Sequence, residues 1–141
     1  MSSDEILRRI SEFHGHLGPF VVVGYRMGEV ANRLLGADAF AKTAVALTGG
    51  KPPRSCVIDG IQLSSGCTIG KGTIGLVDQG EVASIFLSKK DRRRVKISLR
   101  QDKLEEISSV QHGDMEELAR NLYSLDDEEL FEIECQLPRP E

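Results

Sequence analysis

The feature that most constrains the fold is one long apolar segment, Pro19–Leu35, with the sequence PFVVVGYRMGEVANRLL. A proline fits the first turn of a helix, and Gly36 is a natural C-terminal cap. The first half of the segment is apolar around most of its circumference, whereas a surface helix would carry a polar face. The segment therefore predicts a helix in the centre of the core.

The flanking sequence predicts both helices and strands. Helices are expected at residues 3–12, 54–64 and 114–123, and strands at residues 43–48, 73–77, 82–87, 95–99 and 131–137. Because the connections 78–80 and 89–94 are hydrophilic and turn-like, the three middle strands are expected to form an antiparallel meander. Helices packed with such a sheet predict an α+β fold, with a single core domain over residues 1–141.

Composition narrows the possible partners and the compartment. The net charge of −4 gives no overall attraction to nucleic acid or to an anionic membrane, and aromatic residues are scarce at 5%. A nucleic-acid regulator acting through the basic residues 89–96 is a weaker alternative. No apolar run approaches the roughly 20 residues that span a bilayer, and the N-terminus is too polar for a secretory signal. Three cysteines without disulfide-like spacing favour reduced thiols, so a cytoplasmic protein is expected.

Two histidines, His14 and His16, stand just before the central helix in the segment HGHLGP. At a spacing of two residues, their side chains point to the same side of an extended chain, and the glycines permit that form. A nearby helix start disfavours imidazolium and keeps the rings neutral, as metal ligands must be. The alternative is that both rings only satisfy backbone groups of the turn.

A second cluster of reactive residues lies in the stretch CVIDGIQLSSGCTIGKG, residues 56–72. If residues 54–64 are helical, Cys56 and Asp59 share one face, and Cys67 falls on the same line about three turns later, just past Gly66. Two imidazoles and two thiolates suit zinc or another divalent transition metal. The thiols could equally be buried packing residues, and Asp59 could orient a metal-bound histidine, act as a general base or pair with an arginine.

The glycines at the end of this stretch do not form a nucleotide phosphate loop. The first glycine is one residue too close, and Gly72 stands where a serine or threonine would hold magnesium. Lys71 could instead contact an anionic group of a substrate, with Arg26 and Arg54 as further candidates, although each could be a solvated charge. If the site is catalytic, the metal would polarise a carbonyl or activate water, with Asp59 as the base.

Together, the segments FHGHLGPFVVVGYRMG and CVIDGIQLSSGCTIGKGTI resemble the core domain of a known family, that of the E subunit of formylmethanofuran dehydrogenase. The later segments ASIFLSKKDRRRVKISLR and DDEELFEIE extend the resemblance over nearly the whole chain. The resemblance implies an α+β core, often dimeric, with a metal site formed by His14, His16, Cys56 and Cys67, and with Asp59 and Gln62 nearby. Many members carry a cysteine where Gly18 stands here. Longer members append a Cys-rich zinc ribbon, which these 141 residues do not contain.

We therefore expect a metal-binding protein, with zinc as the expected ion, and the resemblance implies a link to one-carbon metabolism in methanogens. Two classes remain open. One is a metal-dependent enzyme that acts on a small anionic or carbonyl substrate. The other is a non-enzymatic accessory or metal-delivery subunit that binds a larger molybdenum or tungsten dehydrogenase. A stripe of small residues on the central helix, Gly24, Gly28 and Ala31, is expected to contact that partner or a second copy in a homodimer.

Overall fold

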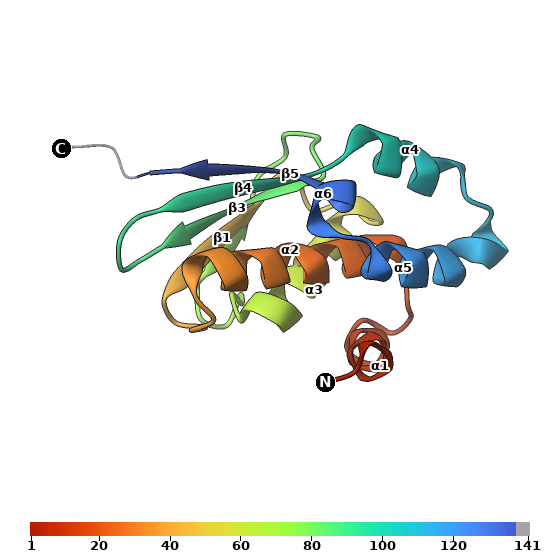
Figure 1. Ribbon diagram of the computed structural model, residues 1–141, viewed down its shortest axis with the longest axis horizontal. Coiled ribbons are helices and arrows are strands. Elements are labelled where there is room, and N and C mark those ends of the chain that lie inside the picture. The colour runs from red at the N-terminus through yellow and green to blue at the C-terminus, as the bar shows by residue number, and fades with distance from the viewer. Residues whose placement is uncertain (138–141) are drawn as a thin grey trace.

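Helices gather on one face of a five-stranded sheet, in a computed structural model that describes residues 1–137 (Figure 1). The strands are β1 (Lys42–Ala46), β2 (Ile74–Leu76), β3 (Ala83–Ser88), β4 (Arg94–Leu99) and β5 (Phe131–Gln136). The helices are α1 (Ser3–His14), α2 (Pro19–Leu35), α3 (Val57–Ser65), α4 (Gln101–Ser109), α5 (Met115–Ser124) and α6 (Asp127–Leu130), with the 3₁₀ turns η1 (Arg54–Cys56) and η2 (His112–Asp114). The expected α+β fold is confirmed.

The sheet has the strand order β2-β1-β3-β4-β5, and only the β1–β2 pair is parallel. The expected meander is therefore wrong at its first connection, because β1 lies between β2 and β3. The physical reason is that both edges of the buried strand β1 need hydrogen-bond partners. β2 satisfies one edge: the Ala44 N–H donates to the Thr73 carbonyl, and the Val77 N–H donates to the Ala46 carbonyl.

The central position expected for α2 is confirmed, since every residue from Pro19 to Gly28 is buried. α2 packs against β3 and β4 on one side and against α3 and α5 on the others. At the contact with α3, a Cβ atom on Gly24 would collide with the Val57 carbonyl oxygen, and one on Gly60 would collide with the Val21 carbonyl oxygen. The two helix backbones therefore touch, and only glycine fits there.

This contact overturns one expectation about partners. Gly28 faces the Ser64 side chain of α3, and Ala31 has no exposed surface. The stripe of small residues does receive a second backbone, but that backbone belongs to the same chain. The stripe is therefore not available to a dehydrogenase or to a second copy.

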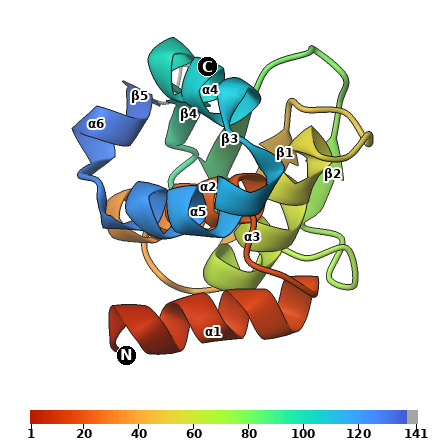
Figure 2. The same cartoon turned by 90° about the vertical axis from the view of Figure 1, so that its right-hand side faces the viewer.

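The first helix, α1, lies across α2 and α3 on the side away from the sheet (Figure 2). The Ser2 hydroxyl caps its N-terminus by accepting from the Glu5 N–H, and Leu7 and Ile10 form its buried face. It ends two residues later than expected, so that His14 is its last residue and Gly15, at φ 102°, reverses the chain. No helix within residues 1–137 is long and apolar enough to cross a bilayer.

Candidate functional site

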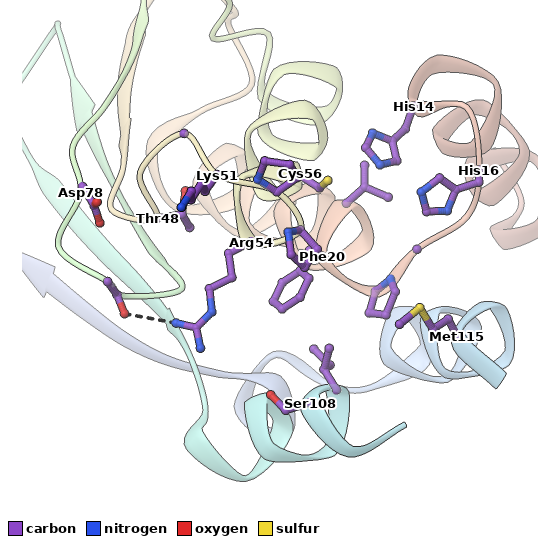
Figure 3. A pocket seen from close by; sticks show the side chains of 18 residues that line it. His14, His16, Phe20, Thr48, Lys51, Arg54, Cys56, Asp78, Ser108 and Met115 are labelled. Atoms are coloured by element: carbon purple, nitrogen blue, oxygen red, sulfur yellow. Dashed lines mark hydrogen bonds between the residues drawn. The ribbon is translucent and has the colours of Figure 1, made fainter. Parts of the chain in front are cut away.

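A pocket of about 780 Å³ opens where the α1–α2 junction, the loop before α3 and the α4–α5 region come together (Figure 3). It is lined by His14, His16, Gly18, Pro19, Phe20, Val21, Thr48, Gly50, Lys51, Pro52, Pro53, Arg54, Cys56, Asp78, Gly80, Ile107, Ser108 and Met115. This volume is within the range of small-molecule sites, which is about 300–1,000 Å³. Reactive side chains from distant parts of the sequence therefore meet in a space that a small ligand can fill.

The two histidines lie side by side at one end of the pocket, with ring centroids 4.9 Å apart. Their meeting does not depend on an extended segment, because His14 is still helical and Gly15 turns the chain so that His16 comes back beside it. Gly18 leaves room for the second ring, since a Cβ atom there would lie 2.8 Å from His16 Cε1. Local turn geometry therefore gathers two imidazoles.

Asp59 of α3 holds the first of these rings. His14 Nδ1 lies 2.6 Å from Asp59 Oδ2, and the His14 side chain is only 10% exposed. An N–H at Nδ1 that donates to the carboxylate fixes the ring and leaves Nε2 as the acceptor atom. Of the three roles that the sequence left open for Asp59, the structure shows contact with a histidine.

Cys56 is the thiol at this end of the pocket. It ends η1 directly before α3, it is half-buried, and its sulfur points toward His14 (Figure 3). Burial raises the pKa of the Cys56 thiol, and the neighbouring Asp59 carboxylate raises it further. These two effects favour the protonated thiol, whereas a bound metal ion would favour the thiolate.

The other expected site residues lie elsewhere. Cys67 follows Gly66 as expected, but it is completely buried, with its sulfur 3.6 Å from the Lys42 carbonyl oxygen of β1. Lys71 is exposed, and its amine lies 5.3 Å from the centroid of the Phe40 ring. Gln62 accepts a hydrogen bond from the Ile69 N–H and so holds the loop after α3. Neither the second thiol nor this lysine lines the pocket.

The ligand types fit zinc in kind. Two imidazoles and one thiol line the same pocket, and a carboxylate supports one imidazole from behind. Within residues 1–137, however, no group of three His, Cys, Asp or Glu side chains already stands in the arrangement of a metal site. The structure therefore brings together three of the four expected ligands, His14, His16 and Cys56, but not Cys67.

The opposite end of the pocket carries two cations, Arg54 and Lys51. Arg54 donates one hydrogen bond, from Nη1 to the Gly80 carbonyl oxygen at 3.3 Å. The sequence nominated Arg54 only as an alternative to Lys71, and it did not nominate Lys51. The available signal was their position on either side of Pro52-Pro53, a rigid dipeptide directly before the helix that carries Cys56.

Comparison with known proteins adds three findings. The chain matches a family model described as "FmdE, Molybdenum formylmethanofuran dehydrogenase operon" over residues 13–132. A relative from Archaeoglobus fulgidus, named a probable S-adenosyl-L-methionine-binding protein, is 35% identical over 94 residues, which are 65% of this chain and 26% of that protein. A solved structure of an FmdE-like protein from Syntrophus aciditrophicus, described as similar to the E subunit of tungsten formylmethanofuran dehydrogenase, has a TM-score of 0.73 at 22% identity, covering 99% of this chain and 74% of that one. At that identity the structural likeness shows the fold alone.

Proposed function

The chain belongs to the FmdE family of formylmethanofuran dehydrogenase operons, and from that premise we propose that it binds zinc through His14, His16 and Cys56. The observation that carries the proposal is the 2.6 Å contact between His14 Nδ1 and Asp59 Oδ2, beside a second imidazole and a thiol in one pocket. A carboxylate on one ring nitrogen is the usual support of a histidine that ligates a metal through the other.

Three protein ligands would leave one coordination position of the zinc open to a ligand in the pocket. Bound there, zinc would supply a Lewis acid that polarises a carbonyl or lowers the pKa of a water molecule. The chain itself would orient a ligand of the metal and enclose the substrate. Asp59 holds the His14 ring, and Phe20 and Ile107 would restrict the entry of water into the pocket. Asp59 is then a positioning residue, because its contact is with His14 and it does not line the pocket.

The test is metal analysis of protein purified without an affinity tag. Wild-type protein is expected to retain stoichiometric zinc, and the Cys56→Ser and His16→Ala variants are expected to lose most of it. Cys67→Ser is the matched control, because this thiol faces β1 and should leave the zinc content unchanged. A full zinc complement in the combined Cys56→Ser/His16→Ala variant would contradict the assignment.

A metal-dependent enzyme is the function that the pocket supports best, because a space of ligand size adjoins the proposed metal ligands. The family description names the operon of formylmethanofuran dehydrogenase, which supports the proposal that the substrate belongs to one-carbon metabolism. Turnover of a small carbonyl compound by the isolated chain, lost in Cys56→Ser, would support this function. S-adenosyl-L-methionine is a second compound to titrate, since the Archaeoglobus relative bears its name, although the chain spans only about a quarter of that relative.

The alternative is an accessory or metal-delivery subunit of a larger molybdenum or tungsten dehydrogenase. The family description names the operon of such an enzyme, and the structure offers a surface for a partner. A groove of about 740 Å³ lies over the sheet, and its lining includes the side chains of Thr43, Val45, Leu47, Ile85 and Leu87. The same groove, and not the small-residue stripe, is the surface that we propose for a homodimer. Copurification of a dehydrogenase would favour the accessory role.

A further inference from the structure

We propose that Arg54 and Lys51 form an anion-binding end of the pocket, which selects a small organic acid as the ligand. This inference deepens the proposed function and rests on it for the reacting end of the ligand, at His14, His16 and Cys56. The anionic group would lie at the opposite end, against the two cations. The substrate class is then a molecule with a polar reacting group, an apolar middle and a terminal anion.

The first argument is that both cations have donors to spare. Arg54 has five N–H donors, and within residues 1–137 it uses one, for the Gly80 carbonyl oxygen. In the same part of the chain, no carboxylate forms an ion pair with Arg54 or with Lys51. The guanidinium reaches into the pocket, so that its remaining donors can meet a ligand (Figure 3).

The second argument is the order of side chains along the pocket. Figure 3 shows Phe20 between Arg54 and the two histidines. Pro19 and Ile107 also line the pocket and add apolar surface. A ligand that reaches from one end to the other must therefore pass along an aromatic ring and aliphatic groups, which favours an apolar or planar middle.

Asp78, the carboxylate that lines the pocket among the described residues, does not cancel the preference for an anion. In Figure 3, Arg54 lies between Asp78 and the histidine end. Among residues 1–137, Asp78 forms no ion pair with either cation. A guanidinium offers two parallel N–H groups to a carboxylate or a phosphate, and an amine adds a point charge. Both anions share this chemistry, so the test has to separate them.

The test compares three probes on the protein as purified: 3-phenylpropionate, phenyl phosphate and the neutral 3-phenylpropionamide. Binding is followed by isothermal titration calorimetry and by chemical shifts of backbone amides. At least one anion is expected to bind roughly 10-fold or more tightly than the amide, as one added charge-assisted hydrogen bond allows. The tighter of the two anions identifies the head group.

Variants locate the effect. Arg54→Gln is expected to reduce the affinity of the anion to that of the amide, while the affinity of the amide stays the same, and Lys51→Gln should cause a smaller loss. Lys90→Gln is the matched control, because it removes one exposed charge from the turn between β3 and β4. Since Lys51 is exposed, its variant keeps the test informative even if Arg54→Gln fails to fold.

Equal affinity for anions and amide in the wild-type protein would overturn the inference, and so would an anion affinity that both Arg54→Gln and Lys51→Gln leave unchanged. Repeating the titrations after treatment with a chelator separates this inference from the proposed function. Selective anion binding by a protein that never holds zinc would refute the metal proposal alone. Zinc binding without anion selectivity would refute this inference alone.

Discussion

Arg26 and Arg54 differ in how many of their N–H donors are already bonded, although the sequence made both of them candidates for binding an anion. Arg26, in the middle of α2, is 7% exposed. It donates to the carbonyl oxygens of Leu122 at 3.2 Å and Tyr123 at 2.6 Å, and to Asp127 Oδ1 at 2.9 Å. Arg54, at the pocket, donates to one carbonyl oxygen within the described residues 1–137, that of Gly80.

The difference shows how to separate a structural cation from one that can bind a ligand. The two carbonyl groups that Arg26 contacts belong to the last turn of α5, where carbonyl groups lack the usual i+4 N–H donors. The Leu122 carbonyl oxygen also accepts from the Leu125 N–H at 3.3 Å. Arg26 therefore caps α5 and ties it to α2, and its donors are used. In the part of the chain that the structure describes, Arg54 makes no comparable set of contacts, so its remaining donors are open to molecules in the pocket.

The largest effect on stability is expected from removing the hydrogen bonds that Arg26 donates to Leu122, Tyr123 and Asp127. Arg26→Met would leave the Tyr123 carbonyl oxygen and Asp127 Oδ1 without the guanidinium that donates to them, at a cost of about 3–5 kcal/mol in the free energy of unfolding. The lower end of that range is expected, because Arg33 still holds Asp127 Oδ2 at 2.6 Å. Arg54→Met is the matched variant and should cost less than about 1 kcal/mol.

Urea denaturation of both variants measures the contrast. The two substitutions remove the same charge and leave the same side chain, so composition cannot explain a difference between them. If both variants lose the same stability, the distinction between a used and an unused arginine does not hold.

A second prediction concerns the support that Asp59 gives to His14. Asp59→Asn removes the negative charge behind His14, so zinc affinity should fall roughly 10- to 100-fold while the unfolding midpoint stays near that of the wild-type protein. Competition with a chromogenic zinc chelator measures the affinity. Asp78→Asn is the control, since Asp78 lines the same pocket at its other end. Equal losses in the two variants would indicate a general charge effect and not support of His14.

The smallest effect concerns the ionisation of two tyrosines, Tyr25 and Tyr123. Burial raises the pKa of Tyr25, and burial together with the Glu29 carboxylate raises the pKa of Tyr123 from 10.0 to about 12. These are the only tyrosines in the sequence. Ultraviolet titration of the folded protein should therefore show one of the two tyrosines, Tyr123, ionising only near pH 12.

The sign of the linked stability follows from these shifts. Between pH 10 and 12 the folded protein keeps the Tyr123 proton while the unfolded chain loses its own, so the folded state loses stability as the pH rises through this window. Tyr123→Phe should make the decline shallower. Ionisation of both tyrosines near pH 10 in the folded protein would show that Tyr123 is solvated, which would contradict the burial of its side chain.

Features with a local cause could be predicted from the sequence. Pro19 and Gly36 bound α2 because proline suits a first turn and glycine suits a C-terminal cap, and Gly66 ends α3 for the same reason. His14, His16 and Cys56 line one pocket because the two segments that carry them flank helices which pack together; that they bind a metal stays a prediction.

Features that depend on contacts between distant parts of the chain could not be predicted from the sequence. Cys67 follows Gly66 as expected, but a distant segment decides its environment, because its sulfur lies 3.6 Å from the Lys42 carbonyl oxygen of β1 and not at the pocket. The pairing of β2 with β1 depends on which edge of a buried strand stays open. The partners of Arg26 come from residues almost one hundred positions later. No short-range pattern encodes these contacts.

The glycine contact between α2 and α3 sets a fixed dimension for the site. α3 follows directly from Arg54 and Cys56 and carries Asp59, while the α1–α2 junction carries both histidines. Because no side chain separates the backbones at Gly24 and Gly60, no substitution there can shorten the gap, and any larger residue must force it open. Redesign of the proposed site should therefore exchange the side chains that line the pocket and leave the spacing of the helices unchanged. The contact between the two backbones therefore fixes the distance between α2 and α3.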